Sequence, residues 1–347
     1  MEVSRIILKP KIQEFVSKLL KEYELYAPVK ENDLINFSAI NTNSEIAYDY
    51  YNSTKPPKQI LFTQSETLFK FKLGRKSAEI EMPENSKKEK IILGIRPCDA
   101  KSFSLLDKVF DNEYKDNYYL TKRRSTILIG LSCPNPKATC FCTSLGSTPF
   151  SKENLDLLLT DIGESYYVEI VTERGAKTIK VADELFSKPT KKEEEKRAEA
   201  QVEAEKKIVR HLSINKIPDQ LEDIYDATIW ESIGEKCIGC GICAYLCPTC
   251  HCFDINDELS ASRTKGARIR TWDYCTHQIY TLQTSGFNPR PTQKYRVRNR
   301  IYHKFKYLHD NFNILGCVGC GRCIEHCPVN IDVTEILSKI NSVSVEK

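Results

Sequence analysis

Hydrophobic positions in the first quarter of the chain follow two different periods. In residues 1–27 the apolar side chains recur at helical spacing, which predicts an amphipathic helix that ends at Pro28. Residues 58–74 (KQILFTQSETLFKFKLG) are instead typical of strand, with Leu68, Phe69 and Phe71 expected in the core.

Two short, uninterrupted apolar runs follow. Residues 90–95 (KIILGI) and 126–131 (TILIGL) predict strands that are buried on both faces, as in a parallel sheet. Further strands are expected over residues 155–161, 166–171 and 178–181, with turns at Gly163 and at Arg174-Gly175. The N-terminal part is therefore predicted to be an α/β domain.

After the predicted strands, charged residues dominate the sequence. Residues 190–207 (TKKEEEKRAEAQVEAEKK) are strong helix formers, and apolar stretches near residues 302–308 and 335–340 also favour helices. We predict an α+β multidomain chain: an α/β domain over 1–182, a helical linker over 183–229, and an α-helical two-cluster ferredoxin-like domain over 230–347.

Composition narrows the class of protein. The chain has 347 residues, 41% of them hydrophobic, a net charge of +4 and fifteen cysteines. No run approaches the roughly 20 apolar residues of a membrane span, and the N-terminus lacks the pattern of a signal peptide. Free cysteines in such number favour a reducing compartment, so a cytoplasmic location is expected.

The pattern C-x₂-C-x₂-C-x₃-C-P occurs twice, at residues 237–248 and 317–328. This is the ligand spacing of bacterial two-cluster ferredoxins, in which the fourth cysteine of each run binds the other cluster. Zinc sites favour paired C-x₂-C instead. The predicted ligands are Cys237, Cys240, Cys243 and Cys327 for one [4Fe–4S] cluster, and Cys317, Cys320, Cys323 and Cys247 for the other.

A second group of cysteines follows the two buried strands. Cys98 and Cys133 come just after them, and Cys140 and Cys142 lie in the next loop. Since ligands gather at the carboxyl ends of parallel strands, we predict that these four bind a third [4Fe–4S] cluster. Buried free thiols and a zinc site are the alternatives.

Three cysteines remain, Cys250, Cys252 and Cys275. Packing is the favoured interpretation, ahead of alternative ligands or a further site. The stretch 263–306 is rich in Lys and Arg, with Asp273 as its sole acid. Compensation of cluster charge or partner docking is favoured there over nucleic-acid binding or a plain solvated face.

Over most of its length the chain resembles a known family, the iron–sulfur β-subunit of cytoplasmic [NiFe] sulfhydrogenases and the related iron–sulfur subunit of anaerobic sulfite reductase. The resemblance rests on Gly94–Ala100, Cys133 with Cys140-Phe-Cys142, Leu158–Asp161, Cys237–Phe253, Trp272-Asp-x-Cys275, Tyr295-Arg-x-Arg298, His303-Lys-Phe305 and Gly316–Cys323. It implies an electron-transfer protein that works between a flavin-bearing, NAD(P)-linked subunit and a hydrogenase-, sulfite-reductase- or heterodisulfide-reductase-type partner. It also supports the additional N-terminal cluster.

No G-x-G-x-x-G, Walker loop or defensible Ser/His/Asp arrangement is found, so no flavin, NAD or catalytic site is predicted in this chain. The favoured hypothesis is an electron relay. One alternative is a subunit whose own N-terminal cluster reduces a sulfur substrate, a role for which Asp99 and the surplus cysteines are candidates. The other is an iron–sulfur sensor that binds nucleic acid through the basic stretch.

Overall fold

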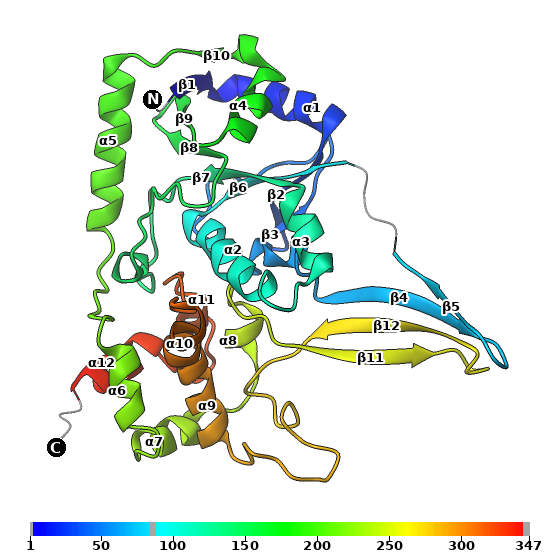
Figure 1. The fold of residues 1–347 in the computed structure, drawn as a ribbon. Coiled ribbons are helices and arrows are strands. Elements are labelled where there is room, and N and C mark those ends of the chain that lie inside the picture. Colours follow the sequence, from blue (N-terminus) through cyan, green and yellow to red (C-terminus); the bar gives the residue numbers. More distant parts are fainter. Residues whose placement is uncertain (1–2, 84–87, 343–347) are drawn as a thin grey trace.

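The structure is a computed structural model that describes residues 3–83 and 88–342, so the ends of the predicted first helix and last domain lie outside it. The N-terminal part is built on an eight-stranded sheet of order β10-β1-β9-β8-β7-β6-β2-β3 (Figure 1). Its strands are β1 (Val3–Leu8), β2 (Glu24–Glu31), β3 (Leu34–Ala39), β6 (Lys90–Ile95), β7 (Thr126–Leu131), β8 (Leu157–Asp161), β9 (Ser165–Ile170) and β10 (Phe186–Ser187).

The four central strands are parallel, which confirms the prediction that the apolar runs made for β6 and β7. β2, β6, β7 and β8 pair in parallel, and the outer strands are antiparallel. Helices α1 (Ile12–Glu22), α2 (Pro97–Phe110), α3 (Asn117–Arg124) and α4 (Glu173–Lys180) accompany this sheet. Residues of β6 and β7 such as Ile92 and Leu128 are fully buried in its core. Because β6 and β7 are parallel neighbours, the loops that follow them lie at the same edge of the sheet, at the carboxyl ends of the strands.

Two local predictions are wrong. Residues 1–27 do not form one helix, because β1 precedes α1 and β2 follows it and runs through Pro28. Proline is tolerated there because β6 pairs with β2 only at residues 24–26, so no ladder partner needs its missing N–H. β6 also bulges at Gly94, which has a φ of 79° and lies against the Pro28 ring.

Residues 178–181 belong to helix α4 and its cap rather than to a strand. Thr172 caps α4 by accepting a hydrogen bond from the Gly175 amide at 3.2 Å. Arg174-Gly175 is therefore not a turn but the first part of a helix. Gly175 faces the sheet, where an added Cβ would lie 2.1 Å from the Asp156 carbonyl oxygen.

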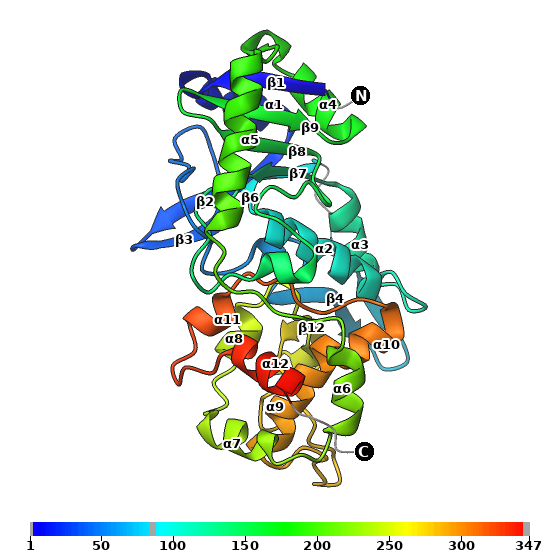
Figure 2. The same cartoon turned by 90° about the vertical axis from the view of Figure 1, so that its left-hand side faces the viewer.

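The charged run forms helix α5 (Lys191–Lys206), which begins with a capping box between Thr190 and Glu193. Both views show α5 running from the level of the large sheet toward the C-terminal helices (Figures 1 and 2). Arg197 attaches it to β9 through an ion pair of 2.9 Å with Glu169. The helix thus contacts the sheet through Arg197, Ala204 is fully buried, and most of its other residues are exposed.

The C-terminal part contains α6 (Ile217–Asp223), α7 (Ile229–Lys236), α8 (Ile242–Tyr245), α9 (Gln293–Tyr302), the π-helical turn η5 (His303–Tyr307), α10 (Leu308–Phe312), α11 (Arg322–Glu325) and α12 (Val333–Ser342). Its core surrounds the fully buried Trp230, whose indole N–H donates to the Ile224 carbonyl at 2.8 Å. Helices over 302–308 and 335–340 are confirmed.

This part was predicted to be mainly α-helical, and the structure adds a second sheet that the prediction did not include. Residues between the two cysteine motifs form the hairpin β11 (Phe253–Leu259) and β12 (Lys265–Trp272). β12 pairs antiparallel with β4 (Ser65–Leu73), which in turn pairs with β5 (Ala78–Glu81). The strand prediction for residues 58–74 is confirmed over β4, but its partner comes from the other end of the chain.

Within the described ranges, no helix has both the length and the apolar character needed to cross a bilayer.

The contact of Gly175 with the sheet gives a stability prediction. Gly175→Ala improves intrinsic helix propensity, yet the new methyl group meets the rigid backbone of Asp156. We expect a net loss of about 1–3 kcal/mol, measured as a lower midpoint of thermal denaturation. Lys177→Ala, on the exposed face of α4, is the matched control and should leave the midpoint nearly unchanged. A Gly175→Ala protein as stable as the control would contradict the packing described.

Candidate metal centres

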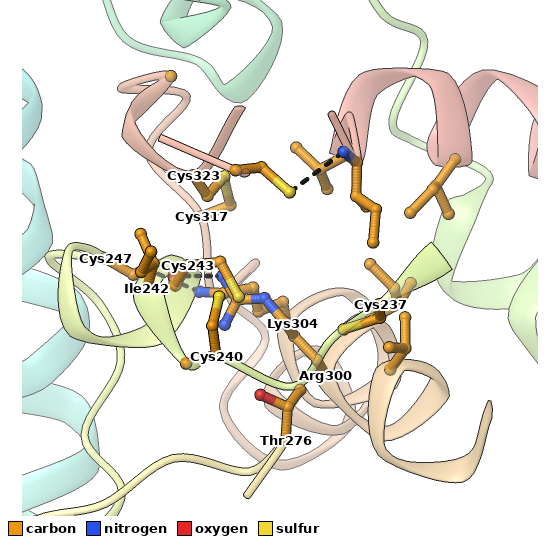
Figure 3. A pocket seen from close by; sticks show the side chains of 18 of the residues that line it. Cys237, Cys240, Ile242, Cys243, Cys247, Thr276, Arg300, Lys304, Cys317 and Cys323 are labelled. Carbon is orange, nitrogen blue, oxygen red and sulfur yellow. Dashed lines mark hydrogen bonds between the residues drawn. The ribbon is translucent and has the colours of Figure 1, made fainter. Parts of the chain in front are cut away.

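The cysteines of both C-x₂-C-x₂-C-x₃-C runs line one cavity of about 1000 Å³. Figure 3 shows their side chains pointing into it from two sides, with Cys317 and Cys323 facing the loop that carries Cys240, Cys243 and Cys247. The remaining wall is apolar, from residues such as Val297, Ile301 and Ile336. Cysteine sulfur donors in an otherwise apolar lining suit an iron–sulfur cluster.

The two runs have the same backbone. Gly241 and Gly321 precede the short helices α8 and α11 with φ of 74° and 76°, a left-handed conformation that glycine adopts without strain. Each also touches a neighbouring element. A Cβ on Gly241 would lie 2.8 Å from the Tyr274 ring, and one on Gly321 would lie 2.5 Å from Thr139 Oγ1.

Two cations line this cavity, the half-buried Arg300 of α9 and the buried Lys304 of η5. Lys304 Nζ donates to Cys247 Sγ at 3.2 Å, to Thr249 Oγ1 at 2.9 Å and to the Gly316 carbonyl at 2.6 Å. Burial opposes charge on this ammonium, but the Cys247 and Cys250 thiolates raise its pKa above the usual value. A π-helical turn at this position is in keeping with a functional site.

The four N-terminal cysteines line a second cavity, of about 430 Å³. Cys98 opens α2 after β6, Cys133 follows β7, and Cys140 and Cys142 lie in the next loop. Burial raises the pKa of the Cys140 and Cys142 thiols to about 12, so metal binding there must release protons.

Arg96, which the sequence analysis missed as a site residue, holds this edge of the sheet. Its guanidinium donates to the Leu131 carbonyl at 3.2 Å and to the Ser132 carbonyl, and stacks 4.1 Å from the centre of the Tyr50 ring. The loops after β6 and β7 are thereby fixed to each other. Its position two residues before Cys98 was the available signal.

The second cavity lies directly against the second ferredoxin motif. Cys320 lines both cavities, and the Phe141 amide donates to the Gly319 carbonyl at 2.9 Å. A Cβ on Gly319 would lie 2.6 Å from the Cys142 nitrogen. Only glycine allows two cysteine loops to approach this closely.

The cysteines form neither disulfides nor a preformed site for one ion. All fifteen cysteines are free thiols. In the described part of the chain, no three His, Cys, Asp or Glu side chains converge on a single ion. The thiols instead line wider spaces that are partly open to solvent.

Comparison with known proteins agrees with this geometry. Residues 236–331 match the model of a 4Fe–4S dicluster domain. The chain is also 30% identical over 328 residues to the sulfhydrogenase 2 subunit beta of Pyrococcus furiosus, an alignment that covers 94% of this chain and 95% of that protein.

This chain belongs to the sulfhydrogenase β-subunit family. The family predicted from the sequence is thus confirmed, and the chain is an iron–sulfur protein with a 4Fe–4S dicluster domain. Two further buried features lie beside these cavities, an ion pair and a third cavity, and no sequence motif indicated either of them.

The first is an ion pair between the two cavities. Arg322, beside Cys323, donates to both carboxylate oxygens of Asp99, beside Cys98, at 2.7 and 2.8 Å. Both side chains are 1% exposed. Arg322 also donates to the Ser53 carbonyl at 2.8 Å. Asp99 is thus committed to this guanidinium, which disfavours its alternative role in substrate chemistry.

The second is a third cavity, of about 270 Å³, which collects the three surplus cysteines, Cys250, Cys252 and Cys275. His251 and His303 also line it, with ring centroids 5.3 Å apart. Burial lowers the pKa of His251 to about 4 and that of His303 to about 3, so both imidazoles are neutral at neutral pH.

The basic stretch 263–306 does not form one surface. Arg300 and Lys304 face the cavities, whereas Arg270 pairs with Glu66 and Asp116, and Arg298 pairs with Asp226. Arg268 pairs with Asp257 on the exposed hairpin. Charge compensation at the cavities therefore involves two of its cations, and others are paired with carboxylates elsewhere.

The buried pair gives a second prediction. Asp99→Ala leaves the Arg322 guanidinium buried without a counter-charge, and we expect a loss of about 3–5 kcal/mol. Urea denaturation of the anaerobically purified chain, followed by tryptophan fluorescence, measures it. Asp257→Ala breaks another bidentate Arg–Asp pair, which lies on the surface, and should have little effect. Equal effects of the two substitutions would show that burial of the Arg322–Asp99 pair is unimportant.

Proposed function

We propose that the chain is the electron-relay subunit of a multi-subunit oxidoreductase of the hydrogenase, sulfur reductase or sulfite reductase type. The observation that carries the proposal is the continuity of the cysteine-lined cavities. Cys320 belongs to the first and the second, and Arg300 and Lys304 belong to the first and the third. Bound iron–sulfur clusters would supply one-electron transfer along such a row.

The ligand sets follow the exchanged pattern of two-cluster ferredoxins, with Cys237, Cys240, Cys243 and Cys327 in one set and Cys317, Cys320, Cys323 and Cys247 in the other. The surroundings of Cys247 support this assignment. Its thiol lies 3.1 Å from Thr249 Oγ1, and both Thr249 and Lys304 donate to the carbonyl of Gly316. Cys247 is thereby tied to the residue directly before Cys317.

A third [4Fe–4S] cluster is proposed for Cys98, Cys133, Cys140 and Cys142. The cavity that the four cysteines line, their free thiols and the buried Arg96 guanidinium support it. Arg96 donates to carbonyl oxygens and has no carboxylate partner in the described chain, so an anionic occupant of the cavity would balance its charge.

The partners are proposed from the family. One is a flavin-bearing, NAD(P)-linked subunit, and the other is a hydrogenase-, sulfite-reductase- or heterodisulfide-reductase-type subunit. The chain itself is proposed to bind no flavin or nicotinamide, because the cavities that its sequence motifs point to are lined by cysteine. The relative in Pyrococcus furiosus is named as a subunit of a sulfhydrogenase, which supports assembly with other redox subunits.

Iron analysis tests the N-terminal cluster. Cys98→Ser should lower the iron content of the anaerobically reconstituted chain by about four atoms, since a cubane contains four irons. Thr148→Ser changes a wall of the same cavity while keeping the hydroxyl that accepts from the Phe150 amide, and should keep full iron. Unchanged iron in Cys98→Ser would contradict a cluster at this site.

Turnover tests the relay. In the assembled complex, Cys320→Ser should abolish electron transfer between the partner subunits while each partner keeps its half-reaction with an artificial dye. The reason is that Cys320 lies between the first and second cavities. Physiological turnover at the wild-type rate would refute the assignment, and loss of the dye reactions would indicate a failure of assembly instead.

A further inference from the structure

The third cavity has the features of a metal centre rather than of a packing defect. Its three cysteines come from two segments, Cys250 and Cys252 before β11 and Cys275 after β12, which the hairpin brings together. The three thiols line one cavity with His251 and His303, so the hairpin places side chains that can bind metal around a single space.

Buried cations surround this cavity without carboxylate partners. Arg300 Nη1 donates to Cys250 Sγ at 3.3 Å, and Lys58 Nζ donates to the Cys250 carbonyl at 2.6 Å while lying 4.2 Å from the centre of the Trp272 ring. Lys304 lines the same wall. Among the described residues, none of these three cations forms an ion pair with Asp or Glu.

Three other buried cations, Arg270, Arg298 and Arg322, each have a carboxylate within ion-pair distance. Two more, Arg96 and Arg296, donate instead to carbonyl and amide oxygens. A buried cation that lacks a counter-charge is strongly unfavourable, so an anionic occupant or the thiolates would balance the charge of Arg300 and Lys304 at this cavity. For Lys58, burial lowers the pKa to about 8. The arrangement of charge around the third cavity therefore suits an anionic group that is bound by cysteine sulfur.

The histidines complete the wall. His251 Nδ1 lies 3.1 Å from the Thr249 carbonyl oxygen, which fixes that nitrogen as a donor and leaves Nε2 with a free lone pair. A histidine that binds metal is held by its second nitrogen in this way. His251 also lines an open groove of about 930 Å³ formed with Phe110 and Phe253, so the cavity lies one side chain from the surface.

We propose that Cys250, Cys252 and Cys275 bind an additional iron–sulfur cluster, with His251 and His303 facing the position that a fourth cysteine would otherwise occupy. The C-x-C spacing with a remote cysteine repeats the arrangement of Cys140 and Cys142 in the second cavity. Sharing of Arg300 and Lys304 places the site at the end of the row of cavities, opposite the N-terminal cysteines.

The test uses the full chain, reconstituted anaerobically with iron and sulfide and then desalted. Cys275→Ala should contain about three or four fewer irons than the wild type and should lack one component of the EPR spectrum of the reduced protein. Cys252→Ala should show the same loss, which guards against a folding defect specific to one variant. Thr276→Ser, next to Cys275, is the control and should retain full iron.

Wild-type iron and an unchanged EPR spectrum in both cysteine variants would overturn the proposal, provided that Cys240→Ala loses iron in the same experiment. These measurements do not depend on turnover. A negative result in the turnover assay would contradict the relay proposal but not the additional cluster. Absence of the additional cluster would contradict this proposal but not the relay.

Discussion

The architecture depends on the buried ion pair between Arg322 and Asp99. Each residue is adjacent to a cysteine of a different cavity, and together they join the second ferredoxin motif to the start of α2. Two ions removed from water are stable only with close, bidentate geometry and further hydrogen bonds, which the carbonyl and hydroxyl of Ser53 provide. The pair therefore tolerates little displacement, and it holds two cysteine loops at a fixed separation that hydrophobic packing alone would specify less precisely.

A second constraint is the distribution of buried positive charge. Arg96, Lys58, Arg300 and Lys304 are directed at carbonyl oxygens and sulfur atoms, whereas Arg270 and Arg298 meet carboxylates. The first group lies beside the cysteine cavities, where thiolates and the groups they bind carry the negative charge. Cations and N–H donors near an iron–sulfur cluster raise its reduction potential, so the same residues that stabilise the site also set its chemistry.

The sequence was most informative where spacing reflects local chemistry. The repeated C-x₂-C-x₂-C-x₃-C-P runs and the parallel strands β6 and β7 were predicted because their patterns depend on neighbouring residues alone. The pairing of β4 with β12 was not, because it joins segments about 190 residues apart and the hairpin is largely exposed. Lys58 carried no local signal as a site residue, whereas Arg96 and Arg322 stand beside cysteines in the printed sequence. The error over residues 1–27 arose because the apolar period of α1, which spans Ile12–Glu22, was extended over the strands that flank it.

The shared sheet has a consequence for how the chain is made. During synthesis from the N-terminus, β4 emerges roughly 190 residues before β12, an interval of roughly 10–40 s at ordinary rates of translation. Throughout that time the backbone of β4 has one unsatisfied edge, which can capture another nascent strand. Charged residues such as Lys70 and Lys72 on β4 oppose such capture. The small sheet can therefore close only after β12 has emerged, and the third cavity is completed later still, because His303, Lys304 and Leu308 also line it.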